Sequence, residues 1–360
     1  MVLLLPVIAA LPAQENAAEG GGEQRYYDSG LGNDDFSRSL RATMRGEDFR
    51  KAKQHEAALE AFNEAIALMP DRMYAAWIGR GDLYYYVYKE YDKALADYTE
   101  VIRRVPEDYV PYRYEFIRRS APGQVFFAYY GRANVYGARG EHEKAITDYT
   151  AAIKLWPEHS SPYMFRAVSY AALGEDDKAV ADYTQVITTA NSRNIDPLNF
   201  TAAYIERAEL YRKQRRYEEA LADYDEAISR GGANLSIAYN NRGIIYRIKG
   251  EPDRAIEDYT EALRLNAGFA EAYNTRGNAW IDKGEQDRAI EDYNQALRIN
   301  PGYAQAYNNR GYACYEKGDM DKARADWEHT LRLNPDHAQA RQNLERLRQE
   351  ERAAASDPES

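Results

Sequence analysis

Residues 255–259 read Ala-Ile-Glu-Asp-Tyr, and residues 289–293 repeat the same five residues 34 positions later. Another 34 positions on, residues 323–327 read Ala-Arg-Ala-Asp-Trp. An Arg-Gly step, first met here at 242–243, follows the same interval. A fixed interval of this length indicates a tandem array of one supersecondary unit and not a single large core.

Each repeat contains two helical patterns joined by a turn. Tyr239, Gly243 and Tyr246 share one face of a first helix because they lie at helical spacing. The apolar residues of 255–263 form a similar stripe on a second helix. Between the two stripes, Gly250 predicts a tight turn, since glycine adopts the left-handed conformation that ends many helices.

The pattern can be followed through eight repeats that together cover residues 39–337. Their predicted bounds are 39–72, 74–108, 126–159, 160–193, 201–234, 236–269, 270–303 and 304–337. The remaining predicted segments are a flexible linker at 14–38, inserts at 109–125 and 194–200, a capping helix at 338–353 and a disordered tail at 354–360.

The repeated residues resemble the tetratricopeptide repeat family. Its pattern is nearly complete in one repeat, at Tyr273, Gly277, Trp280, Ala289, Tyr293, Ala296 and Pro301. The resemblance implies an all-α, right-handed superhelical solenoid of eight helix-turn-helix repeats with a C-terminal capping helix. It also implies a concave groove, lined by the first helices, that binds extended peptides or partner helices.

Side chains beside the packing stripe of each first helix are expected to line this groove. Asn240, Asn274 and Asn308 recur at one site, and an asparagine both donates and accepts hydrogen bonds, so it can pair with any peptide backbone. We therefore predict an asparagine ladder that contacts a partner; the alternative is that these amides are ordinary polar residues on a solvated face. The other groove candidates are Asn241, Asn278, Asn309, Arg247, Tyr312, Tyr315, Tyr85 and Tyr130.

A second ladder is predicted from charged residues. Arginine occupies one first-helix site in every repeat, and aspartate occupies one second-helix site in seven of them. The arginines are Arg45, Arg80, Arg132, Arg166, Arg207, Arg242, Arg276 and Arg310, and the aspartates are Asp97, Asp148, Asp182, Asp223, Asp258, Asp292 and Asp326. Because a planar guanidinium matches a carboxylate, we predict ion pairs between the helices, with independent solvation as the alternative.

Composition and motifs argue against several function classes. The formal net charge of −11 argues against nucleic-acid binding, because phosphates require clustered Lys and Arg. His55-Glu56 begins like a zinc-helix motif but lacks the second histidine, and no phosphate loop or nucleophile elbow is present. Cys314 is the single cysteine, and we expect it to fill the core. We therefore predict no catalytic residue, no metal site and no cofactor.

Residues 1–13 are predicted to be a signal peptide or an apolar tail. The run from Val2 to Leu11 is apolar but too short to cross a bilayer as a helix. No Lys or Arg precedes it, which departs from the usual signal pattern. We expect export, for example to a bacterial periplasm, with the cytoplasm as the alternative, and we expect no stable membrane insertion.

The predicted function is that of a non-catalytic protein–protein interaction scaffold that binds an extended peptide or a partner helix in its groove. The expected partner is a protein that the sequence does not name, and self-association is left open. One alternative is a binder of a glycan or another non-protein polymer through the Tyr-rich groove, since the chain has 32 tyrosines. Another is an enzyme that uses polar groups of the inserts.

Overall fold

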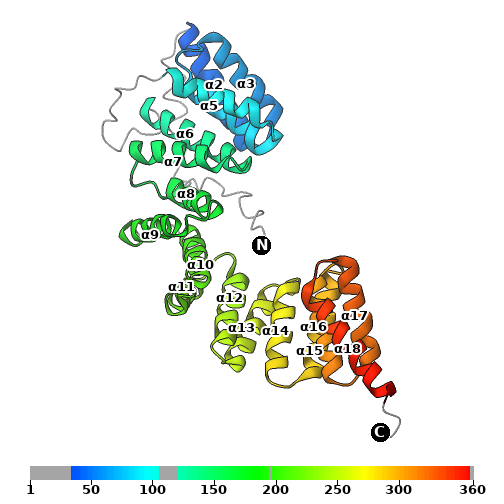
Figure 1. Cartoon of the computed structure of the whole chain (residues 1–360). Coiled ribbons are helices and arrows are strands. Elements are labelled where there is room, and N and C mark those ends of the chain that lie inside the picture. The colour runs from blue at the N-terminus through cyan, green and yellow to red at the C-terminus, as the bar shows by residue number, and fades with distance from the viewer. Residues whose placement is uncertain (1–33, 105–120, 194–196, 357–360) are drawn as a thin grey trace. The chain divides into compact units, whose positions relative to one another are not determined.

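The computed structural model describes residues 34–104, 121–193 and 197–356. Every regular element within these ranges is a helix, so the predicted all-α class is confirmed. The contacts divide the chain into two compact parts, which we call the N-terminal unit (Met1–Leu155) and the C-terminal unit (Trp156–Ser360). Each unit is a stack of helix pairs (Figure 1).

The N-terminal unit contains three helix pairs. The pairs are α2 (Asp35–Lys51) with α3 (His55–Leu68), α4 (Tyr74–Asp82) with α5 (Tyr91–Arg104), and α6 (Ala121–Ala138) with α7 (His142–Leu155). Helix α4 continues without a break into a π-helical segment, η1 (Leu83–Tyr88). In each pair we call the earlier element the first helix, and we count α4 and η1 together.

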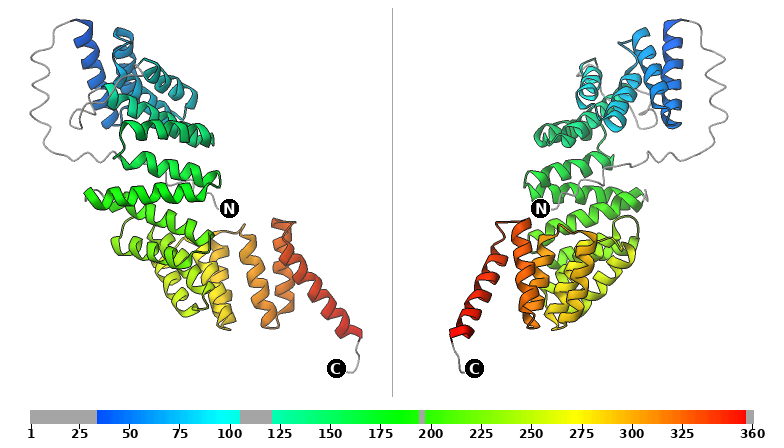
Figure 2. Two further views of the ribbon diagram at one scale, coloured as in Figure 1. Left: turned by 60° about the vertical axis from the view of Figure 1, so that its left-hand side comes forward. Right: turned by 90° about the vertical axis from the view of Figure 1, so that its right-hand side faces the viewer.

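The C-terminal unit contains five pairs and a final helix. The pairs are α8 (Ser160–Ala172) with α9 (Asp176–Arg193), α10 (Pro197–Lys213) with α11 (Tyr217–Arg230), α12 (Leu235–Ile248) with α13 (Pro252–Leu265), α14 (Ala270–Asp282) with α15 (Gln286–Ile299), and α16 (Ala304–Glu316) with α17 (Met320–Leu333). Helix α18 (Ala338–Ser356) covers the last pair with the buried side chains of Ala340, Leu344 and Leu347 (Figure 2).

Close contact between the two helices of a pair depends on glycine. The ring of Tyr293 on α15 is buried under Gly277 of α14, and a Cβ atom at Gly277 would lie 2.6 Å from that ring. Since such a distance is far below van der Waals contact, this crossing requires a residue without a side chain. A different requirement applies at Gly250, whose φ of 78° ends α12 in the left-handed conformation.

The first helices of neighbouring pairs also touch one another. In the N-terminal unit α2 contacts α4 and α4 contacts α6. In the C-terminal unit α10, α12, α14, α16 and α18 form a continuous row of such contacts. We call the surface made by these rows the first-helix face of each unit.

Helix α2 begins earlier than the sequence pattern indicated. It starts at Asp35, inside the predicted linker 14–38, because the Asp34 carboxylate accepts a hydrogen bond from the Ser37 amide at 2.8 Å. Ser39 is buried and donates its hydroxyl to the Ala65 carbonyl of α3 at 2.8 Å. These polar anchors replace the aliphatic residues whose absence suggested a linker.

Three further helix ends differ from the predicted bounds. Helix α6 begins at Ala121 and α10 begins at Pro197, so the ends of both predicted inserts are helical. A proline is favourable in the first turn of a helix, because its missing N–H has no helical partner there. Helix α18 extends to Ser356, beyond the predicted end at 353. Residues 1–33, 105–120, 194–196 and 357–360, which include the predicted signal segment, lie outside the described residues.

Candidate functional site

The predicted ladder of ion pairs is confirmed within the described repeats. Each guanidinium of a first helix donates two hydrogen bonds to an aspartate on the second helix of the same pair, with N–O distances of 2.6–2.8 Å. The pairs are Arg80–Asp97, Arg132–Asp148, Arg166–Asp182, Arg207–Asp223, Arg242–Asp258, Arg276–Asp292 and Arg310–Asp326. In the first repeat, Arg45 instead pairs with Glu64 at 2.5 Å.

Six of the ladder arginines also donate to the preceding repeat: Arg80, Arg132, Arg207, Arg242, Arg276 and Arg310. The Nη1 of Arg276 donates to Thr260 of α13 at 3.1 Å, and its guanidinium lies 5.7 Å from the centre of the Tyr273 ring. Arg310 likewise donates to Asn294 of α15 at 2.6 Å. At these arginines the ladder therefore links three helices. The tyrosine rings beside the guanidinium groups account for part of the high tyrosine content.

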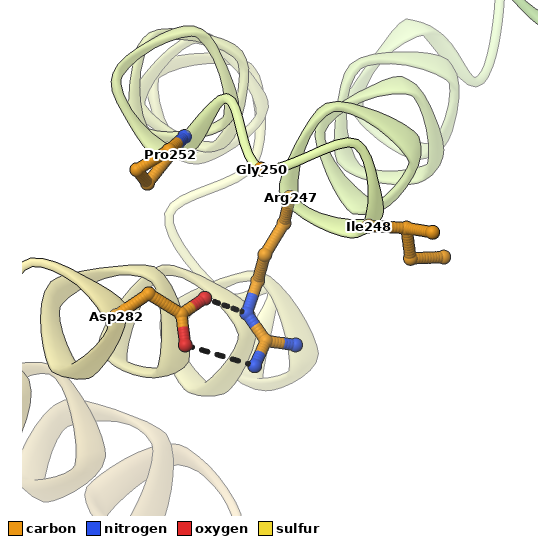
Figure 3. Close-up of a pocket in the computed structure, with 5 residues that line it drawn as sticks. All are labelled: Arg247, Ile248, Gly250, Pro252 and Asp282. Atoms are coloured by element: carbon orange, nitrogen blue, oxygen red, sulfur yellow. Dashed lines mark hydrogen bonds and ion pairs between the residues drawn. The ribbon is translucent and has the colours of Figure 1, made fainter.

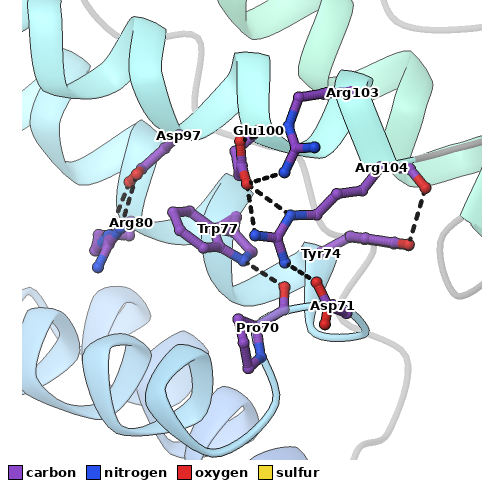
Figure 4. A network of polar contacts seen from close by, with 9 residues as sticks. All are labelled: Pro70, Asp71, Tyr74, Trp77, Arg80, Asp97, Glu100, Arg103 and Arg104. Carbon is purple, nitrogen blue, oxygen red and sulfur yellow. Dashed lines mark hydrogen bonds and ion pairs between the residues drawn. The ribbon is translucent and has the colours of Figure 1, made fainter.

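Figure 4 shows one step of this ladder at the turn between the first two repeats. Arg80 lies 4.8 Å from the Trp77 ring centre while it holds Asp97. The Trp77 indole donates to the Pro70 carbonyl at 3.0 Å, and Arg104 pairs with Asp71 at 2.5 Å. These contacts join the turn to α4 and α5, which gives this cluster a structural role.

The three repeated asparagines lie between first helices. Asn240, Asn274 and Asn308 are buried, with at most 4 % of each residue exposed. Thr275 donates to the Asn240 side chain at 2.9 Å, and Asn309 donates to Asn274 at 3.0 Å. Because neighbouring helices already occupy these amides, they hold the first helices in register. The predicted direct contact between these asparagines and a partner would need an amide that is more accessible than theirs.

Such an amide is found at Asn278. Its oxygen accepts hydrogen bonds from the Tyr293 hydroxyl at 2.8 Å and from Asn309 at 3.0 Å. Its nitrogen donates to no group among the described residues, and the residue is half-buried. Asn241 and Asn309 are also half-buried, but Asn309 both donates to Asn274 and Asn278 and accepts from Gln305. Asn278 therefore keeps the donor capacity that binding a peptide carbonyl requires.

The second-helix tyrosines reach through to the first-helix face. The Tyr98 hydroxyl donates to Asp82 at 2.6 Å, and the Tyr149 hydroxyl donates to Asn134 at 2.8 Å. Each acceptor lies two residues after the ladder arginine of its own first helix. In the α12–α13 pair this site holds Ile244, and the buried hydroxyl of Tyr259 accordingly has no hydrogen-bond partner within the part of the chain that the structure describes.

Arg247 takes part in an ion pair between first helices. Its guanidinium binds Asp282 of α14, with an Nε–O distance of 2.5 Å (Figure 3). The pair lines a pocket of about 490 Å³ together with Ile248, Gly250 and Pro252. Both charged side chains are more than a third exposed, so the pair remains open to exchange with a charged partner.

The candidate Tyr85 requires a correction. Only 6 % of Tyr85 is exposed, whereas the next residue, Tyr86, is 49 % exposed. The interval from Arg80 to Ala94 is 14 residues, whereas the interval from Arg242 to Ala255 is 13. The extra residue is absorbed in the π-helical turn η1, which contains both tyrosines. The exposure of Tyr86 does not require this turn, because Ile248 lies at the same distance from its ladder arginine and is 50 % exposed.

The other three tyrosine candidates lie in different environments. Tyr130 is half-buried, and its ring stacks on that of Phe126 with centres 6.1 Å apart. Tyr315 donates its hydroxyl to Glu350 of α18 at 2.7 Å, which makes it a contact to the capping helix. Tyr312 is 39 % exposed. Of these three side chains, Tyr312 is therefore the most accessible on the first-helix face.

The remaining site classes are metal sites, membrane spans and reactive thiols. Among the described residues, no group of three or more His, Cys, Asp or Glu side chains could hold a metal ion. No described helix is both long enough and apolar enough to cross a membrane. Cys314 is buried, as expected, and burial raises the pKa of its thiol.

Family models match most parts of the repeat array. Models described as "Tetratricopeptide repeat" match residues 43–109, 126–159, 201–231, 236–269 and 304–337, and a model described as "TPR repeat" matches residues 277–318. The chain belongs to the tetratricopeptide repeat family. The search of curated proteins gives no match.

Several solved tetratricopeptide repeat structures are similar to this chain. Pseudomonas aeruginosa pilF is 20 % identical with a TM-score of 0.52, and the match covers 62 % of this chain and 98 % of pilF, which supports the fold. YrrB, described as a TPR protein with an unusual peptide-binding site, is 24 % identical with a TM-score of 0.43, over 53 % of this chain and 95 % of YrrB. The Arabidopsis OM64 TPR domain is 30 % identical with a TM-score of 0.31, over 32 % of this chain and 94 % of that domain.

Proposed function

We propose that this tetratricopeptide repeat protein is a non-catalytic scaffold that binds an extended peptide or a partner helix on its first-helix face. The proposal rests on how the side chains of the ion-pair ladder differ from those of the first-helix face. Ladder arginines and aspartates are paired inside the fold, whereas the face retains large side chains that are more than a third exposed. These are Tyr86 and Val87 in the N-terminal unit and Tyr312 in the C-terminal unit.

The chemistry of this face suits a peptide. Exposed aromatic rings supply large contact area at low cost in side-chain entropy, and they are common at the centres of protein interfaces. The half-buried Asn278 nitrogen can donate to a main-chain carbonyl without regard to the partner's side chains. The buried row of Asn240, Asn274 and Asn308 supports this surface by fixing the helices that present it.

A glycan ligand is supported less well by the same residues. Glycan binding through tyrosines needs flat rings that are open on one side, as was expected of Tyr85 and Tyr130. Tyr85 is buried, and Tyr130 is stacked on Phe126 and lies 6.1 Å from the Tyr149 ring centre. We therefore favour a protein ligand.

Site-specific photo-crosslinking tests the proposal. A photoreactive amino acid replaces Tyr312 in one variant and Leu333 in another; both lie in the last repeat and are 39 % and 42 % exposed, respectively. Expressed in the native host, the variant at position 312 should form discrete protein adducts, because it lies on the first-helix face. The variant at position 333, at the end of a second helix, should not. Equal labelling at both positions, or none at position 312, would contradict the proposal.

Export is proposed separately, on the apolar run of residues 1–13 alone. It is tested by fractionating the native host and measuring the mass of the C-terminally tagged protein in each fraction. A full-length protein confined to the cytoplasm would exclude export.

A further inference from the structure

The first-helix face of the N-terminal unit holds a carboxylate, Asp82, to which no Lys or Arg of the described residues donates a hydrogen bond. Asp82 closes α4 and is half-buried. One of its oxygens accepts the Tyr98 hydroxyl at 2.6 Å, and the other accepts no hydrogen bond from the described residues. Burial raises the pKa of Asp82 to about 6, so this carboxylate is less well stabilised than a solvated one.

The equivalent position in the α10–α11 pair of the C-terminal unit shows which hydrogen-bond donor Asp82 lacks. Glu209 lies two residues after its ladder arginine, as Asp82 does, and it also faces a second-helix tyrosine hydroxyl, that of Tyr224 at 3.4 Å. Glu209, however, receives two hydrogen bonds from Arg212 at 2.7 and 2.8 Å. At Asp82 the nearby arginine, Arg50, is bound through Nε and Nη2 to its own neighbour Glu47, at 3.1 and 2.6 Å.

Aromatic side chains lie beside this carboxylate. Tyr86 is half exposed, and its ring centre lies 4.5 Å from that of Tyr85. Its hydroxyl is desolvated, and this desolvation, followed by the nearby Asp82 and Tyr130, raises its pKa. Asn134 of α6 completes the surroundings and is held by the Tyr149 hydroxyl at 2.8 Å.

We propose that this site binds a Lys or Arg side chain of the partner peptide, with the cation hydrogen-bonded to Asp82 and resting against the ring of Tyr86. The inference rests on the proposed peptide-binding function and adds a residue class to it. A cation supplies the charge that Glu209 obtains from Arg212, and an exposed tyrosine ring attracts cations through its negative face. The net charge of −11 makes a basic partner electrostatically favourable and a second copy of this chain unfavourable.

Selection from a random linear peptide library tests the inference on the full chain. Pools are selected on the wild-type protein and then counter-selected on Asp82→Asn, which keeps the shape of the side chain and removes its charge. The sequences lost on the variant should be rich in Lys and Arg. For single basic peptides from this pool, Asp82→Asn should weaken binding about 10-fold or more, because a charge-assisted hydrogen bond is lost.

The tyrosine has its own variants. Tyr86→Leu should weaken the same peptides roughly threefold, whereas Tyr86→Phe, which keeps the ring, should bind like the wild type. Tyr312→Leu in the C-terminal unit is the matched control and should leave these peptides unaffected. Tyr86 is exposed, so the Tyr86→Leu variant remains a test even where Asp82→Asn folds poorly.

The outcomes separate this inference from the proposed function. If the Asp82-dependent pool is apolar or acidic, or if no sequence depends on Asp82, the cation site is refuted. In that case adducts at position 312 still support peptide binding by the first-helix face. If position 312 forms no adducts while basic peptides bind in an Asp82-dependent manner, the cation site stands and the wider face does not.

Discussion

Removing one arginine of the ladder should destabilise its repeat far more than removing the whole ion pair. Arg276 donates to both oxygens of Asp292 at 2.8 Å, and only 5 % of Asp292 is exposed. Arg276→Ala leaves this carboxylate buried without a counter-charge and also breaks the 3.1 Å bond to Thr260. The expected loss in the free energy of unfolding is about 3–5 kcal/mol.

Replacing both partners by apolar residues of similar size should cost much less. In Arg276→Met combined with Asp292→Leu, no charge remains to be desolvated, and the double variant should lie within about 1 kcal/mol of the wild type. A cycle of Arg276→Met, Asp292→Leu and the double variant should then give a coupling energy of about 2–3 kcal/mol. Arg276→Lys should fall between these limits, because an ammonium cannot bind both carboxylate oxygens in the same planar geometry.

Urea unfolding followed by circular dichroism gives the total effect, and hydrogen exchange of α14 and α15 locates it. The local measurement is needed because neighbouring repeats can unfold separately. The matched control is Arg264→Ala, which removes the exposed pair Arg264–Glu261 within one helix and should change stability by about 0.5 kcal/mol or less. If Arg276→Ala changes stability as little as this control, or if the double variant is less stable than Arg276→Ala, the unpaired buried carboxylate is not the cause of the destabilisation.

Three further predictions concern packing, hydroxyl groups and pH. Gly277→Ala should lower the free energy of unfolding by about 1–3 kcal/mol, because its Cβ would meet the Tyr293 ring at 2.6 Å. Gly137→Ala, whose Cβ has its nearest atom at 3.8 Å, should be neutral or stabilising. Thermal denaturation compares the two variants, and equal changes in stability would show that the Tyr293 ring does not restrict position 277. Tyr293→Phe should cost about 1 kcal/mol through its lost hydrogen bond, whereas Tyr259→Phe, which removes a buried hydroxyl that no described residue binds, should not destabilise. Urea unfolding measures both, and a greater cost at Tyr259 would show that its hydroxyl is bound. The pKa of Asp82 is about 6 in the folded protein and 3.8 in the unfolded chain, so its ionisation lowers the free energy of unfolding as pH rises between these values, by up to about 3 kcal/mol in total. Asp82→Asn should lack this decline in urea titrations across that pH range, and a pH profile unchanged by the substitution would count against the raised pKa.

Most of the fold could be predicted from the spacing of residues along the chain. The recurrence of Arg242, Gly243 and Asp258 at a fixed interval is sufficient to predict the helix pairs and the ladder between them. This works because both partners of each ion pair belong to one repeat, and local helical phase is enough to bring them together. The ends of α2, α6 and α10 were harder to predict, because capping by Asp34 and the proline start at Pro197 depend on single residues outside the repeat pattern.

The candidate site depended more on the structure. Helical phase placed Asn240, Asn274 and Asn308 on the first-helix face, but it could not show that the neighbouring helix lies close enough to bury them. It also placed Tyr85 on this face, although the packing of neighbouring helices buries that side chain.

Residue spacing within the sequence thus determined the repeat, the helix pairs and the ladder, because each depends on neighbours within a few turns of helix. The tertiary structure alone decided which side chains remain accessible. Asp82 and Glu209 occupy the same site of their repeats, and Tyr85 stands where the helix of Glu209 has Arg212, so the sequence already shows that Asp82 lacks this partner. Only the structure shows that Arg50 of α2 lies near Asp82 and is bound to Glu47, because that approach depends on contacts between helices.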